Sequence, residues 1–411
     1  MMPFASLADA EALDRADPLA PFRDHFALPA GVIYLDGNSL GPLPVATLAA
    51  QADAVANQWG SGLIRSWNDA GWIDAPLRIG AKLAPLIGAG ADEVVVTDST
   101  SVNLFKAVVA AAGLDTRPGA LLTEAGNFPT DLYIARGAVA ALPHLRLDVA
   151  APGEILNAIG NDTRVVLLTH VHYKSGHRHD MAAITRAAHA VGAVIIWDVS
   201  HSVGAVAVDL NGCDVDLAVG CGYKYLNGGP GAPSFLFAAR RLQSRLHSPL
   251  AGWFGHADPF AFTDDFVAAP GIARFQCGTP PMLSLLALET GIDVFLQADA
   301  AALFAKSAAL FDLFADLVAA RCPTLKLVTA RDPAARGSHI SFAHPAGYAI
   351  VQALIARGVI GDFRAPDVLR FGLTPLYLGF ADTWRAVDQL AAVLGTEEWR
   401  EARFSLRSKV T

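Results

Sequence analysis

The sequence predicts an α/β protein with a large domain, in which helices flank a mainly parallel sheet, and a smaller α+β domain. Short apolar runs alternate with helical patterns through the middle of the chain, which is typical of a parallel sheet covered by helices. After about residue 275 the pattern changes to longer helices with few strands. The length of 411 residues also favours two hydrophobic cores over one.

The elements of the large domain follow from these runs in chain order. Helices are expected at 102–113 and 180–192, where apolar residues recur at helical spacing. Strands are expected at short apolar runs, because a strand buried on both faces has no polar side. The predicted strands are EVVVTD (93–98), TRVVLLTHVH (163–172), AVIIWD (193–198), VDLAVGCG (215–222) and APSFLFA (232–238).

The last third of the chain predicts helices at 284–295 and 305–322 and strands at SHISFAH (338–344) and VLRFGLT (368–374). The first 50 or so residues are expected to pack with this part of the chain. The expected division is therefore an N-terminal segment at 1–55 that packs with the small domain, a large domain at 56–275 and a small domain at 276–411.

Composition favours a small-molecule role in the cytoplasm. The formal net charge is -8 with acids and bases interspersed, which argues against a nucleic-acid surface. The N-terminal stretch MMPFASLADAEALDRAD lacks the pattern of a signal or transit peptide, and no apolar run is long enough for a membrane span. Four cysteines are scattered without a C-x-x-C pair, as expected in a reducing compartment.

Polar residues that end the predicted strands are candidates for ligand binding, because open α/β sheets bind ligands beyond the carboxyl ends of their strands. Thr100 and Ser101 open an apolar helix and present hydroxyls and backbone N–H groups to an anion, although a plain helix cap is an alternative. Asp198 ends a strand and His201 follows it. This carboxylate suits a positively charged ring nitrogen, but a structural turn cap is equally common.

Lys224 lies in GCGYKYLNGGPG, directly after a predicted strand. Such a lysine is usually a solvated surface residue, but glycines at 220 and 222 and the loop after Tyr225 allow close approach of the backbone or of a flat ligand. A desolvated lysine forms a Schiff base with an aldehyde. A phosphate grip, an acid for a ring nitrogen and a lysine are together the parts that hold pyridoxal 5'-phosphate (PLP).

Other site types fit less well. The chain has no G-x-x-x-x-G-K motif, and Tyr225 occupies the third glycine position of G-x-G-x-x-G, so nucleotide loops are not expected. The histidines of THVHYKSGHRHD form two H-x-H pairs, but no carboxylate completes a familiar zinc motif, so loop polarity is the favoured interpretation and no metal is predicted.

Six motifs spread over nearly the whole chain resemble the kynureninase family. They are YLDGNSLGP (34–42), NFPTDLY (127–133), WDVSHSVG (197–204), GYKYLNGGPG (222–231), GWFGH (252–256) and RFQCGTPP (274–281). The resemblance implies an aspartate aminotransferase-like fold type I enzyme that uses PLP. It also implies a homodimer with active sites at the subunit interface, which hydrolyses L-kynurenine to anthranilate and L-alanine in tryptophan catabolism.

The resemblance further implies roles for individual residues. Lys224 would form the Schiff base with PLP, and Tyr223 would lie near the phosphate and relay a proton. Arg370, in DVLRFGLTPLY, would bind the substrate carboxylate, while Ser39 and Trp67 are weaker candidates for its aniline end. The remaining expected cofactor contacts are Thr100 and Ser101 at the phosphate, Phe128 on the ring, Asp131 nearby, Asp198 at the ring nitrogen, His201, and Trp253 and Thr279 from the partner subunit.

The motif CGTP resembles the bacterial pattern at Gly278 and Thr279, where the animal enzymes carry a Ser-Asn pair. This difference favours unsubstituted kynurenine over 3-hydroxykynurenine, which stays open as a second substrate. An alternative is a cysteine desulfurase or selenocysteine lyase, but the last cysteine, Cys322, lies in a helical run where a buried thiol is expected. A DNA-binding PLP sensor would need an appended basic domain, for which the acidic N-terminus leaves no room.

Overall fold

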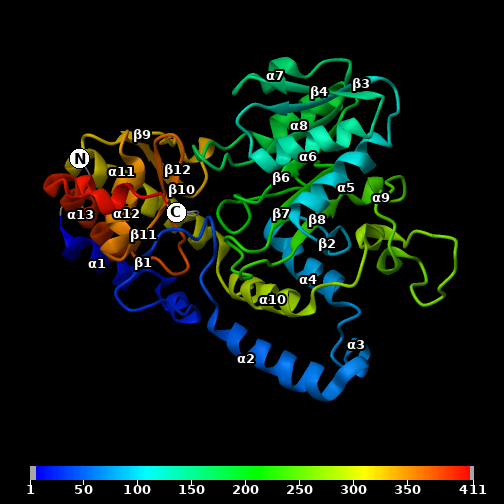
Figure 1. Ribbon diagram of the computed structural model, residues 1–411, viewed down its shortest axis with the longest axis horizontal. Coiled ribbons are helices and arrows are strands. Elements are labelled where there is room, and N and C mark those ends of the chain that lie inside the picture. Colours follow the sequence, from blue (N-terminus) through cyan, green and yellow to red (C-terminus); the bar gives the residue numbers. More distant parts are fainter. Residues whose placement is uncertain (1–5, 408–411) are drawn as a thin grey trace. The chain divides into compact units, whose positions relative to one another are not determined.

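A computed structural model describes residues 6–407 (Figure 1). The chain divides into two compact units. The large unit comprises Thr47–His172 and His179–Asp293, and the small unit comprises Met1–Ala46, Tyr173–Arg178 and Val294–Thr411. These boundaries differ from the expected ones at 55 and 275, because most of the helix after residue 281 groups with the large unit and a six-residue loop groups with the small one.

The large unit contains a seven-stranded sheet in the order β2-β8-β7-β6-β5-β3-β4. Its strands are parallel except β8, which runs antiparallel to both β2 and β7. The mainly parallel sheet expected from the sequence is thus confirmed. The strand bounds are β2 (Val94–Val96), β3 (Gly119–Glu124), β4 (Leu145–Ala150), β5 (Thr163–Thr169), β6 (Val194–Asp198), β7 (Leu217–Cys221) and β8 (Ser234–Ala238).

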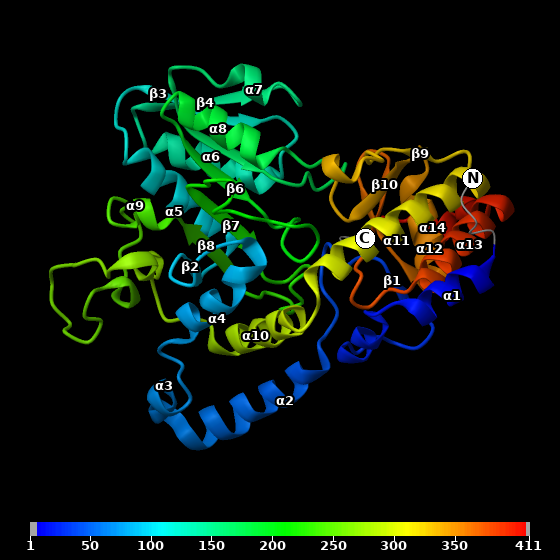
Figure 2. The same ribbon diagram turned by 180° about the vertical axis from the view of Figure 1, so that it is seen from behind.

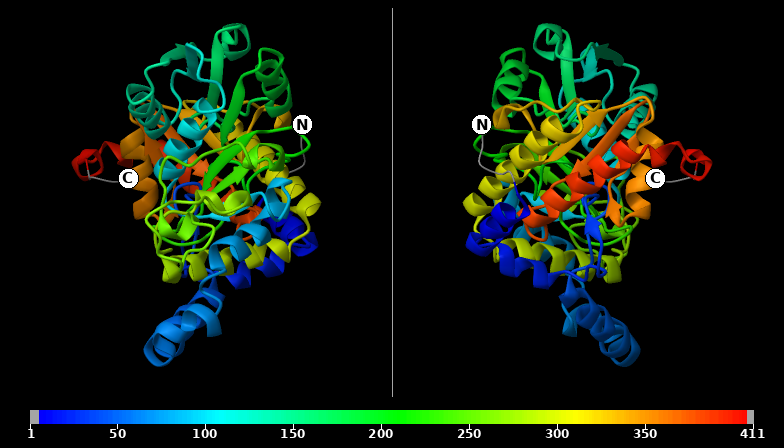
Figure 3. Two further views of the ribbon diagram at one scale, coloured as in Figure 1. Left: turned by 90° about the vertical axis from the view of Figure 1, so that its right-hand side faces the viewer. Right: turned by 90° about the vertical axis from the view of Figure 1, so that its left-hand side faces the viewer.

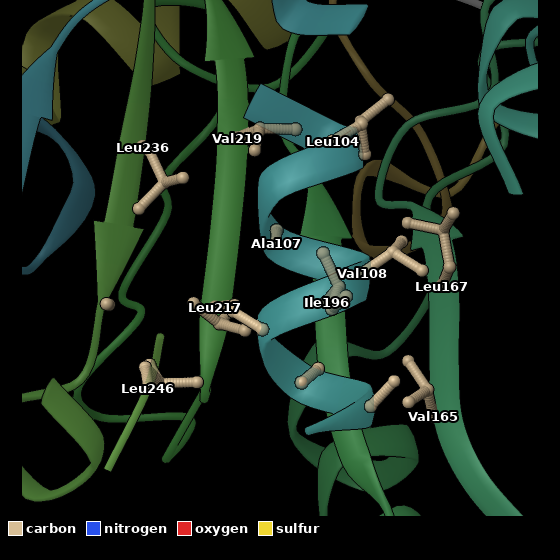
Figure 4. Packing of buried hydrophobic residues seen from close by; sticks show 14 of the residues in the cluster. Leu104, Ala107, Val108, Val165, Leu167, Ile196, Leu217, Val219, Leu236 and Leu246 are labelled. Carbon is tan, nitrogen blue, oxygen red and sulfur yellow. The ribbon is translucent and has the colours of Figure 1, made fainter. Parts of the chain in front are cut away.

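Helix α5 (Thr100–Ala112) covers one face of this sheet. Its Leu104, Ala107 and Val108 belong to the same buried cluster as side chains of β5, β6, β7 and β8 (Figure 4). The α-helices of the large unit also include α3 (Ser66–Asp69), α4 (Ala75–Leu83), α6 (Pro129–Ala140), α7 (Ile155–Ala158), α8 (Met181–Ala190) and α9 (Arg240–Gln243). Apolar side chains of α5 and of the strands are buried against one another. This packing fixes the position of the strand ends, where the polar residues lie.

Two longer helices lie at the unit's margin. Helix α10 (Met282–Leu296) runs beside α4 in Figures 1 and 2, and Glu289 accepts hydrogen bonds from Arg78 of α4. Helix α2 (Val45–Asp53) continues into a π-helical segment (Ala54–Gly62), and the two stand out from the other elements of the large unit (Figure 3). This projecting arm carries several exposed apolar side chains.

The small unit contains a four-stranded antiparallel sheet in the order β12-β13-β10-β9 and a parallel pair of β1 with β11. Its strands are β1 (Ile33–Tyr34), β9 (Lys326–Leu327), β10 (His339–Ala343), β11 (Val359–Ile360), β12 (Asp362–Arg364) and β13 (Val368–Gly372). Its helices are α1 (Leu7–Ala16), α11 (Ala300–Arg321), α12 (Gly347–Ala356), α13 (Phe380–Thr396) and α14 (Ala402–Ser405). Asp14 at the end of α1 accepts hydrogen bonds from the first backbone N–H groups of α13, so the N-terminal helix packs within this unit.

Within residues 6–407, no helix combines the length and the apolar character needed to cross a bilayer.

Candidate active site

Lys224 lies three residues after β7 and is 9% exposed. Its Nζ lies 2.9 Å from Nε2 of His201 and 5.8 Å from the ring centroids of Phe128 and Tyr223. Gly220, four residues before Lys224, is required for a steric reason, because a Cβ there would collide with the Phe235 ring. The group that approaches this glycine closely is therefore the Phe235 side chain of the protein itself. Lys224 itself is a buried amine with a polar neighbour, which differs from an ordinary surface lysine.

A pair of buried acids lies near this lysine. Asp198 ends β6 and its Oδ1 accepts a hydrogen bond from the Ser200 backbone N–H at 2.7 Å. Asp131, in the first turn of α6, is fully buried and accepts a hydrogen bond from Thr169 Oγ1 at 3.0 Å. Burial and the nearby Asp198 carboxylate raise the pKa of Asp131 well above its usual range. Both effects disfavour the charged form of Asp131.

The start of α5 presents a possible anion-binding turn with two hydroxyls. Ser99, rather than Thr100 or Ser101, caps the helix, since its side chain accepts from the Val102 backbone N–H. This leaves Thr100 and Ser101 in the first turn, where backbone N–H groups and the helix dipole favour negative charge. Thr100 Oγ1 lies 3.4 Å from Ser234 Oγ, which donates to the Gly220 carbonyl. A chain of hydrogen bonds thus links this turn to the strand that leads to Lys224.

Aromatic residues complete the set in the large unit. Phe128 directly precedes α6 and is 38% exposed. Tyr223 is half-buried, and burial together with the nearby Cys221 and Asp198 raises the pKa of its hydroxyl. Trp253 lies in a short 3-10 helix, edge-on to Phe254.

Thr279 is exposed on a nearby loop. The Cys277 carbonyl in the same loop accepts from the Phe254 backbone N–H at 3.1 Å, which joins the loop to the Trp253 segment. The side chains of Trp253 and Thr279 have no hydrogen bond to the Lys224 cluster among the contacts of the described residues. Their expected role from the partner subunit stays a prediction.

The donor set of the large unit fits PLP. A buried amine, a carboxylate pair, hydroxyls at a helix start and an exposed phenyl ring are the groups that such a cofactor requires. Asn127, next to Phe128, also has a buried Nδ2 with no hydrogen-bond partner in the described part of the chain, so a polar donor there is left for a ligand.

Arg370 lies in the small unit on β13, directly opposite Asp362 of β12. It is 1% exposed, and its Nε donates to Asp362 Oδ1 at 2.8 Å while its Nη2 donates to Asp362 Oδ2 and to Ser39 Oγ. Its Nη1 donates to the Tyr173 carbonyl at 2.5 Å. The guanidinium is therefore fixed in a single orientation.

Ser39 Oγ accepts a hydrogen bond from Arg370 Nη2 at 2.8 Å, and its expected role at the aniline end of the substrate stays a prediction. A second arginine, Arg364, shares the Asp362 carboxylate at 2.7 Å and is 34% exposed. Asp36 is nearby, and burial together with the Asp362 carboxylate raises its pKa to about 7. Trp67 belongs to the large unit, where its ring packs on Trp72 and Phe254.

Comparison with known proteins identifies the family. A family model for the kynureninase C-terminal domain matches residues 303–390. Kynureninase from Burkholderia mallei (strain SAVP1) is 52% identical over 412 aligned positions, which cover 98% of this chain and 99% of that protein. Kynureninase from Pseudomonas fluorescens is 53% identical with the same coverage. This chain belongs to the kynureninase family.

Membership of the kynureninase family confirms the resemblance seen in the motifs. The chain is a PLP-dependent hydrolase, and PLP is its cofactor. Solved structures confirm the fold: cysteine desulfurase CsdA from Escherichia coli has a TM-score of 0.78 at 20% identity, covering 92% of this chain and 98% of that one. C-DES with glycine linked to its PLP cofactor also has a TM-score of 0.78, at 18% identity, covering 90% and 98%. At these identities the likeness concerns the fold alone.

The desulfurase alternative finds no support in the cysteines. Cys322 ends α11 and is buried, and this burial raises the pKa of its thiol to about 11. Such a thiol is protonated at neutral pH and is a weak nucleophile.

The histidine loop does not assemble a metal site. His170 bonds to Ser202, His172 to the Gly126 carbonyl and His179 to Glu124. In the described part of the chain, no group of three or more His, Cys, Asp or Glu residues is arranged to hold a metal ion.

Several residues of these clusters were missed by the sequence reasoning. Asp36 lies within the motif YLDGNSLGP and Asp362 lies outside the quoted motifs, but nothing in their local sequence indicates that they converge on Arg370. Lys106 gave a usable signal, because it is a single charge within the apolar helix VNLFKAVVAAAG. A charge in such a run is either exposed or paired in the interior.

Proposed function

We propose that this protein hydrolyses L-kynurenine to anthranilate and L-alanine in the cytoplasm, with Lys224 as the central catalytic residue. The observation that carries the proposal is the buried Lys224 amine next to His201, close to the Asp131–Asp198 acid pair. The four cysteines are free thiols, which supports a reducing compartment. The curated kynureninases match along the full chain, which supports the reaction.

Residues of the large unit would hold the cofactor. Lys224 would hold it covalently and Asp198 would pair with its ring nitrogen, while the Ser200 N–H keeps that carboxylate oriented. Thr100 and Ser101 bind its phosphate at the start of α5, and the Phe128 ring stacks on its flat face. When bound, PLP supplies an electron sink that weakens bonds at the substrate carbon carrying the amino group.

Lys224 and Tyr223 would move the protons. The Lys224 amine takes the proton from the substrate Cα and is kept in place by its 2.9 Å contact with His201. The raised pKa of Tyr223 means that its hydroxyl is protonated at neutral pH. Tyr223 is therefore suited to give a proton to the γ-carbonyl oxygen as water adds and to recover a proton from the hydrate when the Cβ–Cγ bond breaks, whereas an ionised tyrosine as the starting form is disfavoured.

Arg370 would bind the substrate α-carboxylate. Asp362 and Ser39 hold the guanidinium in place before a substrate arrives, and its positive charge would attract the carboxylate. Ser39 and Trp67 stay candidates for the aniline end of the substrate. Gly278 and Thr279 favour unsubstituted kynurenine, since no Ser-Asn pair is present to meet a 3-hydroxyl.

The working form would be a homodimer with the active site at the subunit interface. Support comes from the arm formed by α2 and the π-helical segment, where Leu48, Val55 and Trp59 are 58%, 46% and 58% exposed. Large exposed apolar patches on a soluble protein mark interaction surfaces. In the dimer, Trp253 and Thr279 would reach the phosphate of the partner subunit's cofactor.

The first test is an absorbance spectrum of the purified protein, followed by addition of L-kynurenine and detection of anthranilate fluorescence. Wild type is expected to be yellow and to release anthranilate. Lys224→Ala should lose both the cofactor absorbance and nearly all turnover, whereas Lys82→Ala, which removes a lysine paired with Glu289 and Asp293, should keep both. A yellow wild type without anthranilate release would retain the fold and the lysine but reject the substrate.

A further inference from the structure

Lys106 is a buried lysine that the proposed chemistry does not use. It lies on α5, in the second turn after Thr100 and Ser101, and its side chain has no solvent exposure. Its Nζ donates to Asp98 Oδ2 at 2.6 Å and to the Phe275 carbonyl at 2.6 Å. Burial lowers the pKa of Lys106, and the Asp98 carboxylate opposes that shift. Burying a charged amine is costly, so Lys106 depends on both hydrogen-bond partners to stabilise it in the interior.

The first partner, Asp98, determines how the chain enters α5. Its backbone has a φ of 50°, in the left-handed region that non-glycine residues seldom adopt. Its side chain also accepts from Thr97 Oγ1 at 3.0 Å. The next residue, Ser99, caps the helix whose first turn carries Thr100 and Ser101. The direction of those hydroxyls and N–H groups therefore depends on the conformation held at Asp98.

The second partner, the Phe275 carbonyl, begins the loop that carries Thr279. Two residues later the Cys277 carbonyl accepts from the Phe254 backbone N–H, next to Trp253. A Cβ at Gly252 would also approach the Cys277 main-chain carbon at 2.5 Å, so the two segments are in direct contact. Through one ammonium group, Lys106 thus bonds to the segment expected to bind this subunit's cofactor phosphate and to the segment expected to reach the partner subunit's cofactor phosphate.

We propose that Lys106 is a positioning residue for PLP phosphate, which it serves by holding the Asp98 turn and the Phe275–Thr279 loop in register without touching the cofactor. The inference rests on the proposed function, because that function assigns this subunit's phosphate to Thr100 and Ser101 and the partner subunit's phosphate to the Trp253 and Thr279 segments. Lys106 acts on cofactor affinity, and the substrate-binding residues of the small unit are left unaffected.

The chain offers a matched control in the small unit. Lys306 is also buried, and its Nζ lies 2.6 Å from Asp17 Oδ2 and donates to the Pro375 carbonyl at 2.6 Å. The two lysines therefore have the same kinds of partner at the same distances. Replacing each with methionine should lower thermal stability to a similar degree, but only one replacement should change the affinity for PLP.

The experiment measures the dissociation constant of PLP by equilibrium dialysis of full-length Lys106→Met, Lys306→Met and wild type. Lys106→Met is expected to weaken PLP binding about tenfold, which corresponds to about 1.4 kcal/mol, and to shift the phosphorus NMR resonance of the bound phosphate. At saturating PLP its KM for L-kynurenine should stay within about twofold of wild type. Lys306→Met should leave the dissociation constant and the resonance unchanged.

Equal weakening by the two variants, or unchanged binding by Lys106→Met, would overturn the inference. If Lys106→Met does not fold, Asp98→Asn decides, because asparagine tolerates the left-handed backbone but lacks the charge. It should weaken PLP binding about threefold, since a neutral partner makes a weaker bond with the ammonium, and an unchanged constant would again reject the inference. Wild type that binds PLP without releasing anthranilate would reject the proposed reaction and leave this inference standing.

Discussion

Asp362→Asn is expected to destabilise the small unit and to weaken substrate binding. Asp362 is 1% exposed, and its carboxylate accepts hydrogen bonds from Nε and Nη2 of Arg370. It also accepts from Ser39 Oγ at 2.9 Å and contacts Arg364 Nη2 at 2.7 Å. An amide in its place keeps one acceptor oxygen and turns an NH₂ group towards donors, which leaves the Arg370 charge buried without its counterion.

The magnitude follows from the burial of the two partners. Removing one member of a buried ion pair costs about 3–5 kcal/mol. Because Arg364 is 34% exposed and reaches water, only the Arg370 charge is stranded, so the expected loss is at the lower end, about 3 kcal/mol. Arg370→Met should cost less, since Asp362 keeps its contact with Arg364 at 2.7 Å. The double variant removes both charges and should lose about 3 kcal/mol less than the sum of the single losses.

The assay is native-state hydrogen exchange of β12 and β13 in wild type, the two single variants and the double variant. It reports the local free energy of opening. The KM for L-kynurenine is measured in parallel. It should rise at least tenfold in Asp362→Asn, which corresponds to a loss of about 1.4 kcal/mol of substrate binding. If the stability loss of the double variant equals the sum of the two single losses, the two side chains do not act as a buried ion pair. An unchanged KM in Asp362→Asn would refute its role in orienting Arg370.

Three further predictions concern other sites. Asp36 has a folded pKa of about 7, above its ordinary value of 3.8, so its contribution to stability is complete below pH 4 and is lost as the pH rises to 7. Between pH 5 and pH 8, Tm should therefore fall less in Asp36→Asn than in wild type. An equal fall in the two proteins would contradict this. Gly220→Ala should cost about 1–3 kcal/mol through its collision with Phe235, whereas the open site at Gly137 in α6 should gain up to about 1 kcal/mol on the same change, as thermal unfolding will show. Asp131→Asn should change stability by less than about 1 kcal/mol, because burial and the Asp198 carboxylate already disfavour the charged form that the substitution removes; a much larger drop in the urea midpoint would contradict this.

Local patterns in the sequence determined much of the fold. The runs VVV, VVLL and VIIW predicted β2, β5 and β6, since side chains buried on both faces of a sheet leave an uninterrupted apolar record. Strands β3 and β4 were not placed from the sequence, and β4 is half-exposed with the mixed composition LRLDVA. The sequence also did not reveal that β8 runs antiparallel, because strand direction leaves no trace in hydropathy.

The residues that end or follow strands were likewise open to prediction. Lys224, Asp198, Thr100 and Ser101 come where the chain leaves a buried strand or begins a helix. The motifs around Lys224 and Asp198 help to identify the family without any knowledge of spatial contacts. Only the tertiary structure decided which distant groups meet. Lys106 bonds to a carbonyl 169 positions away, and Ser39 reaches Arg370 across 331 positions. Periodicity records whether a side chain is buried, but it cannot record its partner, because that partner is chosen by the packing of the whole chain.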